Sequence, residues 1–299
     1  MNEKKPKPAL YGGQAVIEGV MIRGRRTLAL ACRKPNGEIY RYREELRSPL
    51  TRSRIARLPF IRGVVVLWES LNYGIRMLMK SADVQLEGEQ QQLGKGGNTL
   101  ILGIALAGAL LIFIGIPYLA TSAVRSAVPS SLVLNVAEGL IRLVLLLAYL
   151  FAISFMPDVR RVFAYHGAEH MTIHAFEHGD PLVPDRVAPY PTAHPRCGTA
   201  FLLLVVVLTI VIFAFLPREN LLVDLLVRLA LVIPVASISY EVLRFGAAHE
   251  RSAVMRVIVA PGLLLQSITT RRPDERMIEV AIASMEEALA GDREAEAAA

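Results

Sequence analysis

Cysteine is scarce in this chain. Its 299 residues include two cysteines, Cys32 and Cys197, which lie far apart in the sequence. The sequence therefore excludes a small disulfide-stabilised secreted fold and is typical of a reducing compartment. The opening residues, MNEKKPKPAL, are charged and contain no apolar run of signal-peptide length, so we expect no cleaved secretion signal.

Motifs that recognise nucleic acid are also missing from the sequence. The net charge is +6 and the isoelectric point about 9.5, a balance that suits either nucleic acid or a membrane surface. Without a motif of a known RNA- or DNA-binding class, we expect no nucleic-acid partner. The hydrophobic fraction is 53%, which is high for a soluble protein and indicates membrane segments.

Four long apolar segments dominate the sequence. Each is long enough to cross a bilayer as a helix. Short links join the first two into a hairpin within 99–157, and the third (199–217) and fourth (221–243) into a second hairpin. The sequence predicts a mainly α, polytopic membrane protein with four transmembrane helices, a small N-terminal β segment and amphipathic helices at the cytoplasmic face.

Basic residues concentrate outside the two hairpin turns. The turns contain only Arg125 and Arg218, whereas the N-terminal segment, the 158–198 connection and the C-terminal segment are rich in lysine or arginine. Positively charged loops stay on the cytoplasmic side of a membrane. We therefore expect a multi-pass protein whose termini and 158–198 connection all lie in the cytoplasm.

Segments of different character surround the apolar hairpins. The Asn36-Gly37 dipeptide predicts a β-hairpin turn, and Trp68 and Tyr73 are suited to a helix that lies in the membrane interface. The C-terminal segment predicts an amphipathic helix and then a disordered tail from residue 290. In order, the predicted segments are 1–57 (β-rich), 58–98 (interfacial helix and linker), 99–157 (hairpin), 158–198 (histidine-rich helix and HPRCG loop), 199–243 (hairpin) and 244–299 (C-terminal helix).

The stretch YHGAEHMTIHAFEHG, residues 165–179, holds four of the six histidines. Asp158 can cap a helix here and Gly179 can end it. Four-residue steps drift by about 40° around a helix, so His166 and His170 share the apolar face while His178 has moved off it. His178 is expected to be a solvated residue near the helix C-terminus.

Two histidines at i and i+4 on a helix can offer ring nitrogens to one metal ion. His166 with His170 is the best pair, and His170 with His174 is the second. HGAEH also matches H-x-x-E-H, the inverted zinc-protease pattern, in which Glu169 would be the general base. The alternative is a polar helix face near lipid headgroups, but the density of histidines favours a metal.

Further candidate ligands come from two other places. His194 and Cys197 lie in AHPRCGTAF, a loop that returns to the same membrane surface, and both are zinc ligand types. Alternatively, Cys197 is a small buried apolar residue and His194 an ordinary loop residue. His249 follows the fourth apolar segment and completes the candidate ligand set.

A loose internal repetition connects His249 to His166. Acid–arginine pairs at i,i+4 spacing occur in the second and fourth apolar segments: Glu138 with Arg142, and Asp224 with Arg228. Each pair can form on one helical face inside the bundle. After each segment an arginine precedes a histidine by five residues. If the repetition is a duplication, His166 and His249 face each other across a pseudo-two-fold axis.

Four separated motifs are distinctive: GGQAVIEGVMIRG (12–24), YHGAEHMTIHAFE (165–177), HPRCGTAF (194–201) and PGLLLQSITTRRPDERMIEVAI (261–282). Together they resemble the YqhQ-like family of bacterial membrane proteins, a family of unknown function. The resemblance implies a bacterial cytoplasmic-membrane protein and a metal-dependent enzyme. It places His166, Glu169, His170, His194 and Cys197 in the family pattern. In the first and last motifs, Glu18, Arg23, Gln266 and Thr269 are polar groups that can reach a site.

The sequence thus predicts an integral membrane protein that binds a divalent metal, with zinc the first choice, at its cytoplasmic face. Metal-assisted hydrolysis of an unknown substrate is the natural reaction class. The alternative is a non-enzymatic interaction or scaffold protein that carries a structural metal or histidine cluster and docks a membrane-protein partner. Ion transport through the intramembrane charges ranks third.

Overall fold

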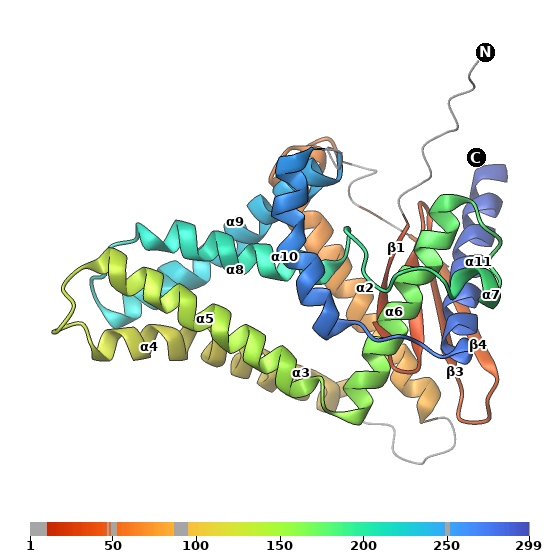
Figure 1. The fold of residues 1–299 in the computed structure, drawn as a ribbon, viewed down its shortest axis with the longest axis horizontal. Helices are drawn as coiled ribbons and strands as arrows, with labels where there is room; N and C mark the ends of the chain where they lie inside the picture. Colours follow the sequence, from red (N-terminus) through yellow and green to blue (C-terminus); the bar gives the residue numbers. More distant parts are fainter. Residues whose placement is uncertain (1–10, 47, 49–52, 87–94, 249–251, 299) are drawn as a thin grey trace.

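The computed structural model describes residues 11–46, 48, 53–86, 95–248 and 252–298. The molecule is elongated, with a β-sheet and its covering helices at one end and apolar helices at the other (Figure 1). Helix dominates and the described sheet is small and antiparallel. This confirms the mainly α class with an N-terminal β segment.

The central strands of the sheet are buried on both faces. Its strands, in chain and spatial order, are β1 (Gly12–Val16), β2 (Gly19–Arg23), β3 (Thr27–Arg33) and β4 (Ile39–Glu45). Helices α6 (Pro157–His178) and α11 (Glu275–Ala297) cover one face, and α2 (Ile61–Gln85) packs on the other. Because β2 and β3 are central and covered on both sides, both are continuous apolar runs. The predicted turn joins β3 to β4, with Gly37 at φ +91°.

Helix α11 extends further than the sequence predicts. The tail from residue 290 is expected to be disordered, but the helix continues to Ala297. Asp292 explains the difference, because its buried carboxylate accepts hydrogen bonds from the backbone N–H groups of Arg25 and Arg26 and from the Tyr11 hydroxyl. The β2–β3 turn therefore anchors the end of α11 through a contact between residues far apart in the sequence.

Helix α2 confirms the helix predicted between residues 58 and 98. On its buried side, Glu69 forms an ion pair with Arg23 at 2.6 Å and accepts a hydrogen bond from Ser48. On the other side, Trp68 is 66% exposed. This amphipathic pattern is the one expected of an interfacial helix, and its location at a bilayer surface stays a prediction.

The apolar end contains helices of different lengths. They are α3 (Lys95–Leu110), the π-helical turn η2 (Leu111–Gly115), α4 (Ile116–Ala123), α5 (Ser131–Ile153), α8 (Gly198–Ala214) and α9 (Leu221–Ala248). Three stretches of the described chain are long and apolar enough to cross a membrane: Gly103–Ala123, Ser131–Ile153 and Leu221–Gly246. The third predicted span is the shorter helix α8, with 17 residues. It ends before Pro217, which disfavours helical backbone at the residue preceding it. A count of four spans is therefore not confirmed.

Helix α10 (Ala253–Thr269) has no counterpart among the predicted elements. It contains Pro261, which removes one backbone hydrogen bond from a helix. Gly262 lies so close to Ala200 of α8 that a Cβ atom there would come within 2.5 Å of the alanine Cβ. Leu265 is buried against α5 and α8. Tertiary packing therefore holds a helix that local sequence preference alone does not indicate.

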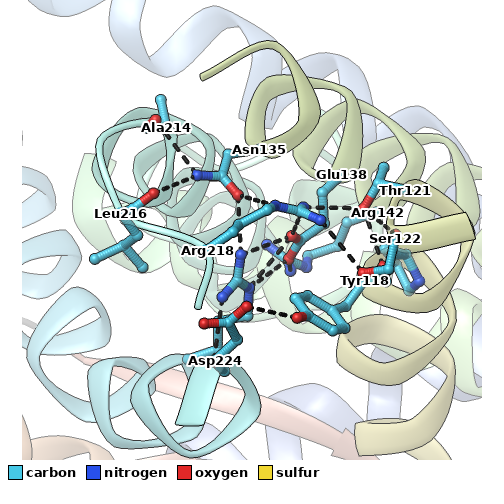
Figure 2. Close-up of polar contacts among 12 residues, drawn as sticks. Tyr118, Thr121, Ser122, Asn135, Glu138, Arg142, Ala214, Leu216, Arg218 and Asp224 are labelled. Carbon is cyan, nitrogen blue, oxygen red and sulfur yellow. Dashed lines mark hydrogen bonds and ion pairs between the residues drawn. The ribbon is translucent and has the colours of Figure 1, made fainter. Parts of the chain in front are cut away.

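A buried polar cluster connects the apolar helices α5 and α9 and the turn before α9 (Figure 2). The Glu138 carboxylate accepts hydrogen bonds from three arginines: Arg142 at 2.9 Å, Arg218 at 2.6 Å and Arg228 at 3.0 Å. The Glu138–Arg142 pair is thus present as predicted. The Asp224–Arg228 side-chain pair is not, because the Asp224 carboxylate accepts from Tyr118 at 2.5 Å and Arg228 reaches Glu138 instead. One carboxylate therefore joins α5, α9 and the turn between α8 and α9.

We predict that Glu138→Gln destabilises the protein by about 3–5 kcal/mol, because it leaves buried guanidinium groups without their shared carboxylate. Glu219→Gln is the matched control, since Glu219 is exposed in the turn between α8 and α9 that also contains Arg218. Unfolding of both variants in detergent, followed by circular dichroism, measures the difference. Equal stability of the two variants would contradict a structural role for the cluster.

Candidate metal centre

Helix α6 carries the candidate ligands and ends at the predicted glycine, but Asp158 lies in its first turn and is not the predicted cap, because Met156 occupies the N-cap position. The helix starts with Pro157 as its first helical residue and ends at Gly179, whose φ is +78°. Gly179 suits this position because glycine adopts left-handed backbone conformations without a steric penalty. The helix lies between the sheet and the loop of residues 180–197, so its central residues are buried.

Gly167 sets how closely neighbouring backbone approaches α6. A Cβ atom at Gly167 would meet the carbonyl oxygen of Arg271 and lie 3.2 Å from Cγ2 of Thr192. The backbone N–H of Arg271 donates to the Phe163 carbonyl at 2.9 Å. Two chain segments, one after α10 and one before α8, therefore pack directly on the helix between His166 and His170.

Both segments offer backbone carbonyls to the histidines. Nδ1 of His166 lies 2.9 Å from the Thr269 carbonyl oxygen, and Nδ1 of His170 lies 2.6 Å from that of Thr192. A carbonyl oxygen only accepts, so Nδ1 is the protonated nitrogen in each ring. Each Nε2 then carries a lone pair. Metal-binding histidines typically show this arrangement, in which the second ring nitrogen donates to a backbone carbonyl.

Cys197 completes a group of three candidate ligands. Its Sγ atom lies 3.1 Å from Nε2 of His166, and the rings of His166 and His170 are 4.3 Å apart between centroids. One ligand atom from each of the three residues falls within 4.8 Å of the others. Cys197 also caps the N-terminus of α8, where its sulfur accepts from the Thr199 N–H.

His194 belongs to a second group that the sequence analysis did not assemble. His174, Glu177 and His194 also offer ligand atoms within 4.8 Å of one another. Nε2 of His194 is 3.4 Å from a Glu177 oxygen, and Arg196 forms an ion pair with the same carboxylate. The arginine places positive charge at this group, which makes it a weaker cation site than the first. The predicted ligands are thus divided between two adjacent clusters.

Gln266 holds the loop that carries His194. Its side-chain oxygen accepts from the His194 N–H at 2.7 Å, and its side-chain nitrogen donates to the His194 carbonyl at 2.9 Å. Gln266 is fully buried. Gln266 and Thr269 thus lie beside the candidate ligands, whereas Glu18 and Arg23 are engaged in ion pairs with Arg161 and Glu69.

Burial changes the pKa values of two histidines, one in each cluster. It lowers the pKa of His170, an effect that the nearby Cys197 partly offsets, and it also lowers the pKa of His174. Both histidines therefore favour the neutral form, which is the form that binds a metal ion.

Glu169 is buried between α6 and β1. Burial raises its pKa to about 7, although the proximity of His166 and His194 and the backbone N–H of Gly13 act in the opposite direction. Its Oε2 atom has no hydrogen-bond partner in the described part of the chain. A Cβ atom at Gly13 would lie 3.0 Å from the Glu169 carboxyl carbon, so this glycine leaves room for the carboxylate. A carboxylate with a pKa near neutrality suits a general base, and that role stays a prediction.

His178 and His249 are the two histidines that belong to neither cluster of described residues. His178 is exposed at the end of α6, as predicted. His249 lies outside the described residues, so its expected placement opposite His166 stays a prediction. The sequence analysis missed Glu177 as part of a second group, although its spacing three residues after His174 was a signal. It also missed the carbonyls of Thr192 and Thr269, for which side chains give no signal.

Fold and site together define a mainly helical protein with membrane-length apolar helices and a buried histidine–cysteine cluster beside a small antiparallel sheet. The chain belongs to the family described as "Protein of unknown function (DUF1385)", whose model matches residues 58–291. It is 31% identical to "Uncharacterized protein YqhQ" of Bacillus subtilis (strain 168), over 97% of this chain and 95% of that protein. No solved structure matches the chain.

Gly167→Ala should destabilise the protein by about 1–3 kcal/mol, because the added methyl group forces α6 away from the Arg271 carbonyl. Gly103→Ala is the matched control, since its Cβ atom would meet nothing within 4 Å and alanine favours a helix. Thermal unfolding of both variants tests this packing. A Gly167→Ala variant as stable as the control would contradict it.

The buried Glu169 should make stability depend on pH. Its pKa rises from 4.5 in the unfolded reference to about 7 in the folded protein, so the folded state holds the proton more tightly. Metal-free protein should therefore lose about 3 kcal/mol of stability, relative to Glu169→Gln, as pH rises through this window. Denaturant unfolding between pH 4 and pH 8 gives the comparison. A stability difference that does not change with pH would show that the carboxylate is not buried in this way.

Proposed function

We propose that this protein is a membrane metalloprotein that binds a divalent metal ion, zinc, through His166, His170 and Cys197. The observation that carries the proposal is the pair of Nδ1 contacts to backbone carbonyls, which direct both Nε2 lone pairs to the side of the Cys197 sulfur. Two imidazoles and a thiolate are a zinc ligand set. Three protein ligands also leave one tetrahedral position for another group.

Metal-assisted hydrolysis is the reaction class that fits these residues. A metal ion at this position would supply a Lewis acid. Glu169 follows the H-x-x-E-H pattern and, with a pKa near 7, can accept a proton at neutral pH. Thr269 and Thr192 fix the tautomers of the two histidines through their carbonyls, and Gln266 orients the His194 loop.

We further propose that the protein crosses the membrane four times and that this face lies in the cytoplasm. Helix α8 has 17 residues, which at about 1.5 Å per residue lies at the lower limit for crossing the hydrocarbon core. Counting it as the fourth span places residues 158–198 and both termini on the arginine-rich side, in the cytoplasm. The candidate ligands then lie at the cytoplasmic end of the apolar helices.

The burial of the site favours a second candidate function. His170 is 2% exposed and Cys197 8%, so a substrate would require movement of the surrounding segments to reach them. A closed metal site is typical of a structural role. The protein would then be a membrane interaction or scaffold protein in which the metal fixes α6 to the start of α8.

Metal analysis of the full-length protein in detergent tests the proposal. Wild-type protein loaded with zinc and then desalted should retain about one ion per chain at this site, and His166→Ala, His170→Ala and Cys197→Ala should each retain far less. His178→Ala is the matched control, because His178 is exposed on the same helix. A wild-type protein without bound zinc, or an equal loss in the control, would contradict the assignment.

Glu169→Gln separates the two functions. In a hydrolase, the variant should retain zinc and lose turnover of any substrate that the wild-type protein hydrolyses. Full turnover by the zinc-loaded variant would exclude Glu169 as the general base.

A further inference from the structure

A pocket lined by arginines lies where α6 begins, apart from the candidate ligands. Its volume is about 460 Å³. The lining residues are Pro157, Arg160, Arg161 and Ala164 of α6, Arg271 and Arg272 after α10, and Met277 of α11. Four of the seven lining residues are therefore arginines, and the lining contains no acidic residue.

Two of these arginines are already engaged. Arg161 donates through Nε and Nη2 to the Glu18 carboxylate, at 2.5 Å each. Arg272 donates to the Ala188 carbonyl at 3.1 Å. In contrast, the exposed side chains of Arg160 and Arg271 make no hydrogen bond or ion pair with the described part of the chain. As far as the described residues go, these two guanidinium groups are therefore available to an anion from outside the protein.

The start of α6 adds to the positive potential of the pocket. The helix has no side-chain N-cap, so the backbone N–H groups of its first turn lack the usual acceptor. Helix N-termini attract anions, and phosphate is a common ligand there. Asp158 in the first turn offsets part of this potential, while Asp274 is occupied as the N-cap of α11. Together with the two available arginines, the helix terminus favours a phosphate group.

Large exposed apolar side chains at the junction of α5 and α6, which leads directly to Pro157 of the pocket, indicate the source of that phosphate. The membrane-length helix α5 ends at Ile153, four residues before Pro157. At this junction Phe151, Phe155 and Met156 are 57%, 65% and 52% exposed. Such a group of exposed apolar side chains beside positive charge is typical of a surface in contact with lipid. Exposed apolar side chains would add nothing to the binding of a free phosphate ion, whereas they can contact the acyl chains of a lipid.

We propose that this pocket binds the phosphate headgroup of an anionic membrane phospholipid, with Arg160 and Arg271 as the phosphate ligands. The acyl chains would lie along Phe151, Phe155 and Met156 at the end of α5. Arginine suits this role because its planar guanidinium group can donate two parallel hydrogen bonds to one phosphate. The inference rests on the proposed membrane location, but it does not require that the metal site be occupied.

Native mass spectrometry of the full-length protein in detergent tests the proposal. Three probes are titrated: dioctanoyl-phosphatidylglycerol, dioctanoyl-phosphatidylcholine and inorganic phosphate. The wild-type protein should bind the anionic lipid more tightly than the other two. Arg160→Gln/Arg271→Gln should weaken that binding by about tenfold or more, because two charge-assisted hydrogen-bonding groups are lost.

A double variant of equal charge provides the control. Arg186→Gln/Arg293→Gln removes two exposed arginines that lie outside the pocket lining, so its affinity for the anionic lipid should stay at the wild-type value. A second variant, Arg160→Lys/Arg271→Lys, keeps the charge and should retain part of the affinity. Circular dichroism and zinc content of the same samples show whether each variant is folded, and whether any loss is separate from the metal site.

Several results would overturn the proposal. Equal affinity for the zwitterionic and anionic lipids would exclude selection of an anionic headgroup. Inorganic phosphate bound as tightly as the anionic lipid would make this a site for free phosphate. An unchanged affinity in Arg160→Gln/Arg271→Gln, or an equal loss in the control variant, would show that lipid binds elsewhere or through general charge attraction.

Discussion

The close packing of backbone against α6 at Gly167 is the constraint on which the candidate site depends. Any larger residue there would push away the Arg271 carbonyl and the Thr192 side chain. Those same two segments supply the carbonyls that fix the His166 and His170 rings. The loop that continues from Thr192 also delivers Cys197. Tautomers, ring orientations and the position of the thiol thus all follow from one short contact between segments distant in sequence.

Sequence periodicity was enough to find α6 and to single out the pair that shares its buried face. It could not show that His194 joins His174 and Glu177, because helix geometry says nothing about where a loop of 15 or so residues returns. Nor could it show that Glu18 forms an ion pair with Arg161, which lies 143 residues further along the chain. The types and spacing of the side chains identified the candidate ligands, whereas tertiary contacts determine which of them lie close together.

In the fold, too, some elements follow from local sequence signals and others from tertiary contacts. Hydropathy located the apolar helices and the Asn36-Gly37 turn located the sheet, because both signals are local. Helix α10 and the end of α11 depend instead on Gly262 against Ala200 and on Asp292 against the β2–β3 turn. The shared carboxylate of Glu138 is a similar case. Spacing predicts its pair with Arg142, but Arg218 and Arg228 approach from a turn and a helix of the second hairpin.

Helix α6 links the apolar helices of the molecule to the candidate metal centre within four turns. Its first two turns carry Arg160 and Arg161 at the pocket, and the next two carry His166 and His170. The end of α10 and the residues that follow it contact both regions, because the Thr269 carbonyl accepts from His166 while Arg271 lines the pocket. A phosphate held by Arg271 would therefore restrain the segment that fixes the His166 tautomer. Since Gly167 leaves no space between this segment and the helix, the pocket and the histidines share one rigid frame.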